Sequence, residues 1–214
     1  MESVGFKEWS LVCDALGGGE QSIILRKGGI AEGRQGFSFR HREFFLFPTF
    51  FHEQVAKVRI ASANLLWAGD TIAIRWYAKV ERALRIGSLR TAEALAPLHI
   101  LTPEVVRERF GYRDEGLHVA FVRVFEISPS WILQNKKRFA GCLSWVDLPS
   151  PPEMKMRPVV DDEAHQRLRA QFDAITLSSR AKVEGSRGRY LYDFRGGIPR
   201  LSLGMTGNWS TLVS

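Results

Sequence analysis

The sequence of 214 residues predicts an α+β fold with a mostly antiparallel sheet and flanking helices. Residues 71–86 place apolar and charged side chains at alternate positions, as a half-buried strand does. Residues 117–127 are apolar on nearly both faces and predict a central strand. Short helical segments interrupt the strands without a regular strand–helix repeat. That order disfavours a parallel α/β sheet and favours antiparallel pairing.

The chain begins with a predicted helix and a short strand. The helix is indicated by apolar residues at the spacing i, i+3, i+4 and i+7, namely Trp9, Val12, Cys13 and Leu16. Glycines 17–19 end it, because glycine readily adopts the left-handed conformation of a helix C-terminus. Residues 22–26 then predict a short central strand, and the glycines of residues 28–33 predict a loop.

Three further elements are expected before the long strand. Residues 37–40 and 43–47 predict strands, and Pro48 closes the second of them. Residues 52–66 predict a helix. The run 71–86 is longer than an ordinary strand, so we expect a bend or a bulge near Arg82.

A second helix start is well marked at Thr102. This residue can cap the helix, Pro103 suits the first helical position, and Glu104 complements the helix dipole. The helix is expected to end at residues 110–111.

The domain organisation predicted from the sequence is one α+β domain, residues 1–175, followed by a tail. Prolines in residues 149–152 mark a linker, and a helix over residues 161–175 completes the domain. Residues 176–214 are basic and rich in glycine, and contribute four of the seven net positive charges. Such a tail is typical of a disordered end or of an arm that contacts a phosphate backbone.

Composition excludes several classes of protein. With 45% hydrophobic and 25% charged residues, the chain is neither largely disordered nor collagen-like. Its two cysteines, Cys13 and Cys142, are too few for a disulfide framework or a four-cysteine zinc site. No apolar stretch approaches the length of a membrane span, and the N-terminus lacks a signal-peptide pattern. A cytoplasmic protein without a membrane segment is therefore expected.

The net charge is +7, and nucleic acid is the commonest partner of a basic protein. Arg26 and Lys27 follow a strand and precede two glycines, so they are candidates for binding phosphate. A plain turn with two solvated cations is the alternative. The absence of Gly-Lys-Ser/Thr after the glycines excludes a Walker loop.

His41, Glu43 and His52 flank an apolar run and are candidates for lining a substrate pocket. Imidazoles and carboxylates also bind divalent metals, so a metal-dependent hydrolase or nuclease is the first alternative function. Ordinary surface polarity is the other interpretation. No specific cofactor and no oligomeric state are indicated.

The predicted strand 71–86 offers a candidate nucleic-acid surface. If Trp76 faces the core, then Tyr77 lies on the other side with Arg75 and Lys79. An exposed Arg–Tyr–Lys row can stack on bases and bind phosphate, although it is equally typical of a solvated face. An exposed patch at residues 44–51 would instead indicate a protein-interaction module, the second alternative.

Several blocks resemble a bacterial family of domains of unknown function. They are GEQSIILRKGGI at residues 19–30, Gly-Phe at 36–37, FLFPTFFH at 45–52, GCLSWV at 141–146 and PVVDDE at 158–163. The resemblance covers about residues 6–175, departs from the family at Glu53, where glutamine is expected, and implies no established activity. The strand pattern is also similar to that of small PUA-like barrels, which are found in RNA-modifying and base-recognising domains. Nucleic-acid binding or processing through a basic pocket is therefore the first functional prediction.

Overall fold

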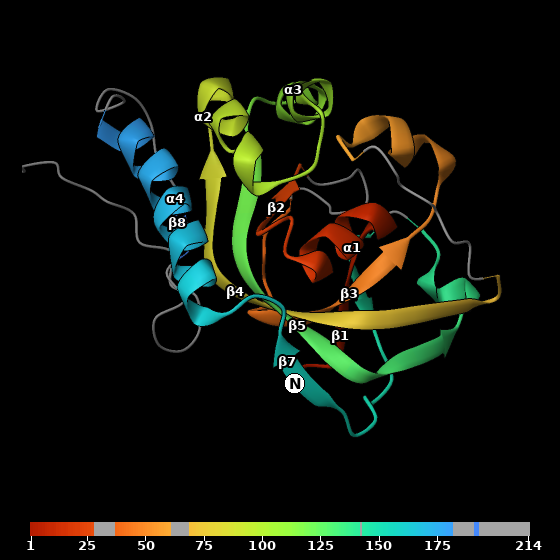
Figure 1. Cartoon of the computed structure of the whole chain (residues 1–214). Coiled ribbons are helices and arrows are strands. Elements are labelled where there is room, and N and C mark those ends of the chain that lie inside the picture. The colour runs from red at the N-terminus through yellow and green to blue at the C-terminus, as the bar shows by residue number, and fades with distance from the viewer. Residues whose placement is uncertain (28–36, 61–68, 142, 182–190, 193–214) are drawn as a thin grey trace, which may run out of the picture.

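The computed structural model describes residues 1–27, 37–60, 69–141, 143–181 and 191–192 (Figure 1). Their strands form one sheet in the order β2-β5-β4-β3-β1-β6, with β7 paired to β5 and β8 to β4. The strands are β1 (Val4–Trp9), β2 (Ile23–Arg26), β3 (Glu43–Thr49), β4 (Thr71–Ile86), β5 (Leu117–Gln134), β6 (Trp145–Asp147), β7 (Lys155–Pro158) and β8 (Leu191–Tyr192). Only β1 and β3 pair in parallel among the described strands, which confirms the predicted α+β fold with a mostly antiparallel sheet.

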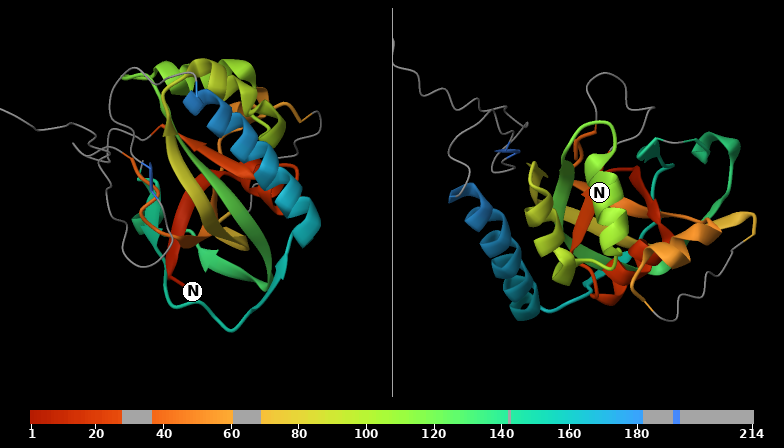
Figure 2. Two further views of the ribbon diagram at one scale, coloured as in Figure 1. Left: turned by 90° about the vertical axis from the view of Figure 1, so that its left-hand side faces the viewer. Right: turned by 90° about the horizontal axis from the view of Figure 1, so that it is seen from above.

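The helices flank this sheet. They are α1 (Ser10–Gly18), α2 (Leu89–Ala94), α3 (Pro103–Gly111) and α4 (Asp162–Ala181), with 3-10 turns η2 (His52–Lys57), η3 (Ala96–Leu98) and η4 (Lys137–Phe139). Figure 1 shows α2 and α3 together at one end of β4 and β5, and Figure 2 shows α4 lying along the outside of the sheet. None of the described helices is both long and apolar enough to cross a bilayer.

The long antiparallel pair of β4 and β5 is the centre of the sheet. Residues 71–86 form one strand, as predicted, and its pairing with β5 is irregular at Ile74/Trp76 and at Val80/Arg82. The second irregularity confirms the expected bulge near Arg82. The first was not predicted, and it reverses the alternation, so that Tyr77 continues the side occupied by Ile72 and Ile74.

Tyr77 is therefore 0% exposed, and the prediction of an exposed row formed by Arg75, Tyr77 and Lys79 is wrong. Its ring packs against Phe45 at a centroid distance of 4.8 Å. Burial raises the pKa of the Tyr77 hydroxyl. Trp76, assigned to the core by simple alternation, is only half-buried.

The sheet has hydrophobic clusters on both faces. Along β3, Phe44 and Leu46 enter the cluster that includes the helices, whereas Phe45 and Phe47 enter the cluster shared with β6 and η4. All four side chains are buried. The apolar run at residues 44–47 is therefore core rather than an exposed interaction patch, which removes the main support for a protein-interaction module.

Several local predictions need correction. The first residues form β1, which was missed, and β2 lies at one end of the strand order rather than at its centre. Residues 37–40 are not a strand, although Phe37 and Phe39 are buried. The expected helix 52–66 is a 3-10 turn that ends at Lys57, and residues 61–66 lie outside the described chain.

In the C-terminal half, the structure agrees better with the elements predicted from the sequence. Helix α3 begins after Thr102, whose side chain accepts a hydrogen bond from the Val105 N–H. Strand β5 extends past the predicted end at residue 127, and α4 extends past residue 175. The division into a domain of residues 1–175 and a tail stays a prediction, since most of the tail lies outside the described residues.

Candidate functional site

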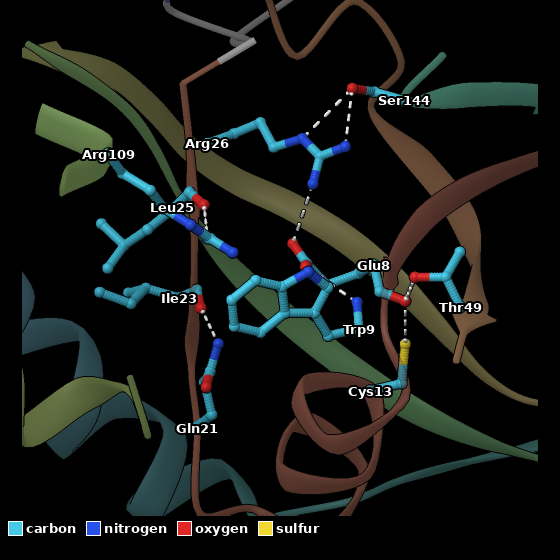
Figure 3. A network of polar contacts seen from close by, with 10 residues as sticks. All are labelled: Glu8, Trp9, Cys13, Gln21, Ile23, Leu25, Arg26, Thr49, Arg109 and Ser144. Atoms are coloured by element: carbon cyan, nitrogen blue, oxygen red, sulfur yellow. Dashed lines mark hydrogen bonds and ion pairs between the residues drawn. The ribbon is translucent and has the colours of Figure 1, made fainter. Parts of the chain in front are cut away.

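Two ends of the sheet meet along a line of polar side chains. Strand β2 is first in the strand order and β1 and β6 are last, yet Arg26 at the end of β2 contacts both Glu8 of β1 and Ser144, the residue before β6. The sheet must curl to allow these contacts, and the result is an incomplete barrel. We call this region the seam and define it by Glu8, Trp9, Arg26, Arg109 and Ser144 (Figure 3).

Glu8 is the acidic centre of the seam and is 1% exposed. It lies on the same side of β1 as Phe6, so a charged group faces the barrel interior. Its Oε1 accepts a hydrogen bond from the Trp9 N–H at 2.9 Å. Its backbone oxygen accepts hydrogen bonds from Thr49 Oγ1 at 2.9 Å and from Cys13 Sγ at 3.8 Å. These contacts hold the carboxylate in place.

Arg26 spans the seam. Its Nε and Nη2 donate to Ser144 Oγ at 3.2 and 3.0 Å, and its Nη1 lies 3.7 Å from Glu8 Oε2. The guanidinium also lies 5.3 Å from the centre of the Phe6 ring. The Arg26 side chain remains 21% exposed, so solvent and ligands reach part of this fork.

Arg109 approaches the seam from α3. Its Nη1 donates to the Leu25 backbone oxygen at 2.8 Å, and its guanidinium lies 4.4 Å from the centre of the Trp9 ring. Lys57 Nζ lies 5.9 Å from the same ring, so Trp9 holds two cations close together. Burial lowers the pKa of Arg109, Glu8 opposes this shift and Arg26 adds to it. An arginine remains charged at neutral pH even so.

A neutral histidine lies beside Arg26. His118 of β5 is the register partner of Arg26 and lies in edge contact with the Phe37 ring, 5.6 Å between centroids. Burial, with help from Arg85 and Lys27, lowers the pKa of His118 to about 4. Its imidazole is therefore uncharged at pH 7, and the positive charge of the seam comes from arginine and lysine.

The structure separates the predicted phosphate-binding pair. Lys27 points away from Arg26, because successive residues of a strand face opposite sides. Its Nζ donates to the backbone oxygens of Phe110, Asp114 and Gly116, and it pairs with the Asp114 carboxylate at 3.3 Å. These contacts fasten the loop after α3 to β2, so Lys27 is engaged in the fold and Arg26 alone faces the seam.

The predicted cluster of His41, Glu43 and His52 does not form. His41 Nδ1 lies 2.7 Å from Glu2 Oε2, and the His41 ring lies 4.7 Å from the centre of Trp145. Glu43 pairs instead with Lys79 at 3.7 Å and with the terminal amino group at 3.9 Å.

His52 lies beyond the opposite end of β3 from these two residues, so one pocket lined by all three is ruled out. Within the described residues, no group of three or more histidine, cysteine, aspartate or glutamate side chains could hold a metal ion.

The two cations of β4 are likewise engaged at separate places. Arg75 pairs with Asp14 of α1 and lies 5.5 Å from the centre of the Trp76 ring. Lys79 pairs with Glu43 and lies 5.5 Å from the Phe125 ring.

Of the five seam residues, only Arg26 was a candidate site residue from the sequence. The four that were missed are Glu8, Trp9, Arg109 and Ser144, and Trp9 was assigned to the apolar face of a helix although it ends strand β1. A signal was available for Glu8, because Val4, Phe6 and Glu8 alternate as one face of a strand, with a charge where an apolar residue would continue the pattern. Arg109 and Ser144 carried no such signal. They reach the seam only through the placement of α3 and of the turn before β6.

A family model described as a domain of unknown function (DUF1802) matches residues 5–171. No curated protein sequence matches the chain.

Among solved structures, the ASCH protein from Zymomonas mobilis aligns at 13% identity with a TM-score of 0.40, covering 78% of this chain and 93% of that one. A mutant of the same protein aligns at 13% identity with a TM-score of 0.39, covering 79% and 98%. This likeness is too weak to assign a function.

Proposed function

The chain belongs to the DUF1802 family, and we propose that it is a cytoplasmic protein that binds nucleic acid through the seam. In this proposal the guanidinium groups of Arg26 and Arg109 contact phosphate oxygens of the polynucleotide backbone. Lys57, held against Trp9, adds a third positive charge beside them.

One observation carries the proposal: two guanidinium groups from different elements lie near the buried carboxylate of Glu8, Arg26 at 3.7 Å and Arg109 over the ring of the adjacent Trp9. Arg26 comes from β2 and Arg109 from α3, and Glu8 is the acidic residue between them. Arg26, Arg109 and Lys57 carry three positive charges, whereas Glu8 and Glu108, the two carboxylates that act on Arg109, carry two negative charges. The seam therefore keeps a net positive charge, and a phosphate diester supplies the missing negative charge.

The geometry suits backbone contact better than base reading. The Trp9 ring has Arg109 over it at 4.4 Å, so it serves to place a cation rather than to stack on a base. The Arg26 fork is oriented by Ser144 and Glu8, which leaves less side-chain entropy to lose on binding. Phosphate contacts of this kind position a polymer and make its binding dependent on salt.

The test is fluorescence polarisation with labelled single- and double-stranded DNA and RNA over a series of salt concentrations. Arg26→Gln and Arg109→Gln should each weaken binding and reduce the slope of log affinity against log salt by about 0.9 on duplex. Arg157→Gln is the control, because it removes the same charge from the exposed strand β7. That variant should match the wild type.

A further variant, Arg26→Lys, separates binding from folding. Arg26→Lys keeps the charge and loses the two-nitrogen contact with Ser144, so the salt slope should stay at the wild-type value even if the protein is less stable. Thermal unfolding of every variant shows which ones are folded at the assay temperature. The proposal is refuted if the wild type shows salt-dependent binding to none of the four polymers. It is also refuted if the salt slopes of the wild type and both glutamine variants are equal.

A further inference from the structure

A cavity lies apart from the seam, between α2, α3 and the segment that follows η2. Its volume is about 280 Å³. The lining residues are Arg59, Glu93, Ala96, His99, Leu101, Pro103, Val106 and Arg107. Four of these are apolar, and the charged ones come from three different parts of the chain. At about 30 Å³ for each water in the liquid, the space corresponds to roughly nine non-hydrogen atoms.

His99 is the unusual member of this lining. It is 3% exposed, and its Nδ1 accepts a hydrogen bond from the Leu101 N–H at 3.1 Å. Burial, together with Arg59 and Arg109, lowers the pKa of His99 to about 3, so the ring is neutral and Nε2 carries the proton. Among the described residues, no acceptor reaches this buried Nε2–H. A buried donor without an acceptor is rare in folded proteins, and an acceptor on a ligand would satisfy it.

Arg59 supplies a cation beside the same ring. Its Nη2 donates to the backbone oxygens of Ala96 and His99, which holds the guanidinium at the cavity. Within the described chain, Arg59 forms no ion pair with a carboxylate. Arg107 is different, because its Nε lies 2.8 Å from Glu93 Oε1.

The charges of the lining specify the ligand. Arg107 and Glu93 balance each other and His99 is neutral, so the wall carries one unmatched positive charge, that of Arg59. A singly charged anion neutralises it, whereas a phosphate dianion would bring a second negative charge towards Glu93. The apolar wall formed by Leu101, Pro103 and Val106 favours a ligand with a compact apolar body.

We propose that this cavity binds a small organic monocarboxylate, whose carboxylate contacts Arg59 and the Nε2–H of His99 while its apolar part packs against Leu101, Pro103 and Val106. Arginine and carboxylate form a charge-assisted pair, and the buried imidazole N–H gains its missing acceptor. The proposal does not depend on nucleic-acid binding at the seam, because the two sites have no lining residue in common.

Benzoate is a suitable probe, since it has about nine non-hydrogen atoms and matches the volume of the cavity. Nuclear magnetic resonance of histidine-labelled wild-type protein should show a shift of the His99 Nε2–H signal on titration, with affinity in the millimolar range or tighter. Benzamide, the neutral counterpart, and inorganic phosphate should bind at least about tenfold more weakly.

Two variants and one control identify the contacts. His99→Asn retains an acceptor for the Leu101 N–H and loses the Nε2–H, and Arg59→Gln removes the cation. Each should weaken benzoate binding about tenfold or more in isothermal titration at constant ionic strength. Arg90→Gln removes the same charge from an exposed position of α2 that does not line the cavity, and it should bind as the wild type does.

The wild-type titration decides the matter even if a variant fails to fold. A His99 signal that does not move with benzoate, or that moves equally with benzamide or phosphate, overturns the proposal. Equal benzoate affinity in the wild type and in folded His99→Asn and Arg59→Gln does the same.

Discussion

Replacing Glu8 with glutamine tests whether the seam closes the barrel electrostatically. The substitution keeps the shape of the side chain and its acceptor for the Trp9 N–H, and it removes the charge facing Arg26. At 3.7 Å and an effective dielectric constant of about 20, the attraction between Glu8 and Arg26 is about 4.5 kcal/mol. Solvent screening of Arg26, which is 21% exposed, reduces this, so we expect a loss of about 2 to 3 kcal/mol in the free energy of unfolding.

Urea denaturation at pH 7, followed by circular dichroism, measures this loss. In thermal unfolding, the melting temperature should fall by roughly 4 to 12 °C, given about 2 to 4 °C per kcal/mol for a protein of this size. Glu2→Gln is the matched control, because Glu2 pairs with His41 near the surface and should contribute less than about 1 kcal/mol.

A double-mutant cycle with Arg26→Gln assigns the effect to the pair rather than to Glu8 alone. If Glu8→Gln is no less stable than Glu2→Gln, or if the cycle shows no coupling, the electrostatic closure of the barrel is refuted.

Two other predictions concern packing and pH. Gly17→Ala should lower the free energy of unfolding by about 1 to 3 kcal/mol, because the new Cβ would overlap the Trp76 ring. Gly18→Ala should be neutral or slightly stabilising, because its new Cβ meets no atom. Equal melting temperatures for the two variants would contradict this. The pKa values of His99 and His118 are lowered from 6.5 to about 3 and 4, so the stability they contribute is present above pH 6.5 and is lost as the pH falls. The free energy of unfolding, measured by urea denaturation from pH 7.5 to 5, should fall by about 1.4 kcal/mol per pH unit for each histidine below pH 6.5. A free energy of unfolding that does not change with pH would rule this out.

The elements predicted well are those whose signal is local. Residues 71–86 were recognised because one face of a strand repeats every two residues, and α3 because Thr102, Pro103 and Glu104 are adjacent in the chain. The resemblance to a family of domains of unknown function was also carried by short blocks, and the match over residues 5–171 confirms it. Each of these signals can be read without knowing what lies across the sheet.

The errors arose where a distant contact decides the outcome. Simple alternation put Trp76 inside and Tyr77 outside, and an irregularity in pairing with β5 reversed that order. Residues 37–40 looked like a strand because two of their side chains are aromatic. Phe37 and Phe39 are buried, but the segment does not pair with the sheet. His41 and His52 looked close in sequence, although a strand between them carries them to opposite ends.

The sequence by itself determined the α+β class, the long strand over residues 71–86, the start of α3 and the membership of a family, because hydrophobic periodicity and capping act between residues a few positions apart. Only the tertiary structure decided which charged residues share a site. Arg26 meets Glu8 and Ser144 because the sheet curls, and Arg109 arrives with α3. Arg26 and Ser144 are 118 residues apart in the chain, so no local sequence pattern predicts their contact.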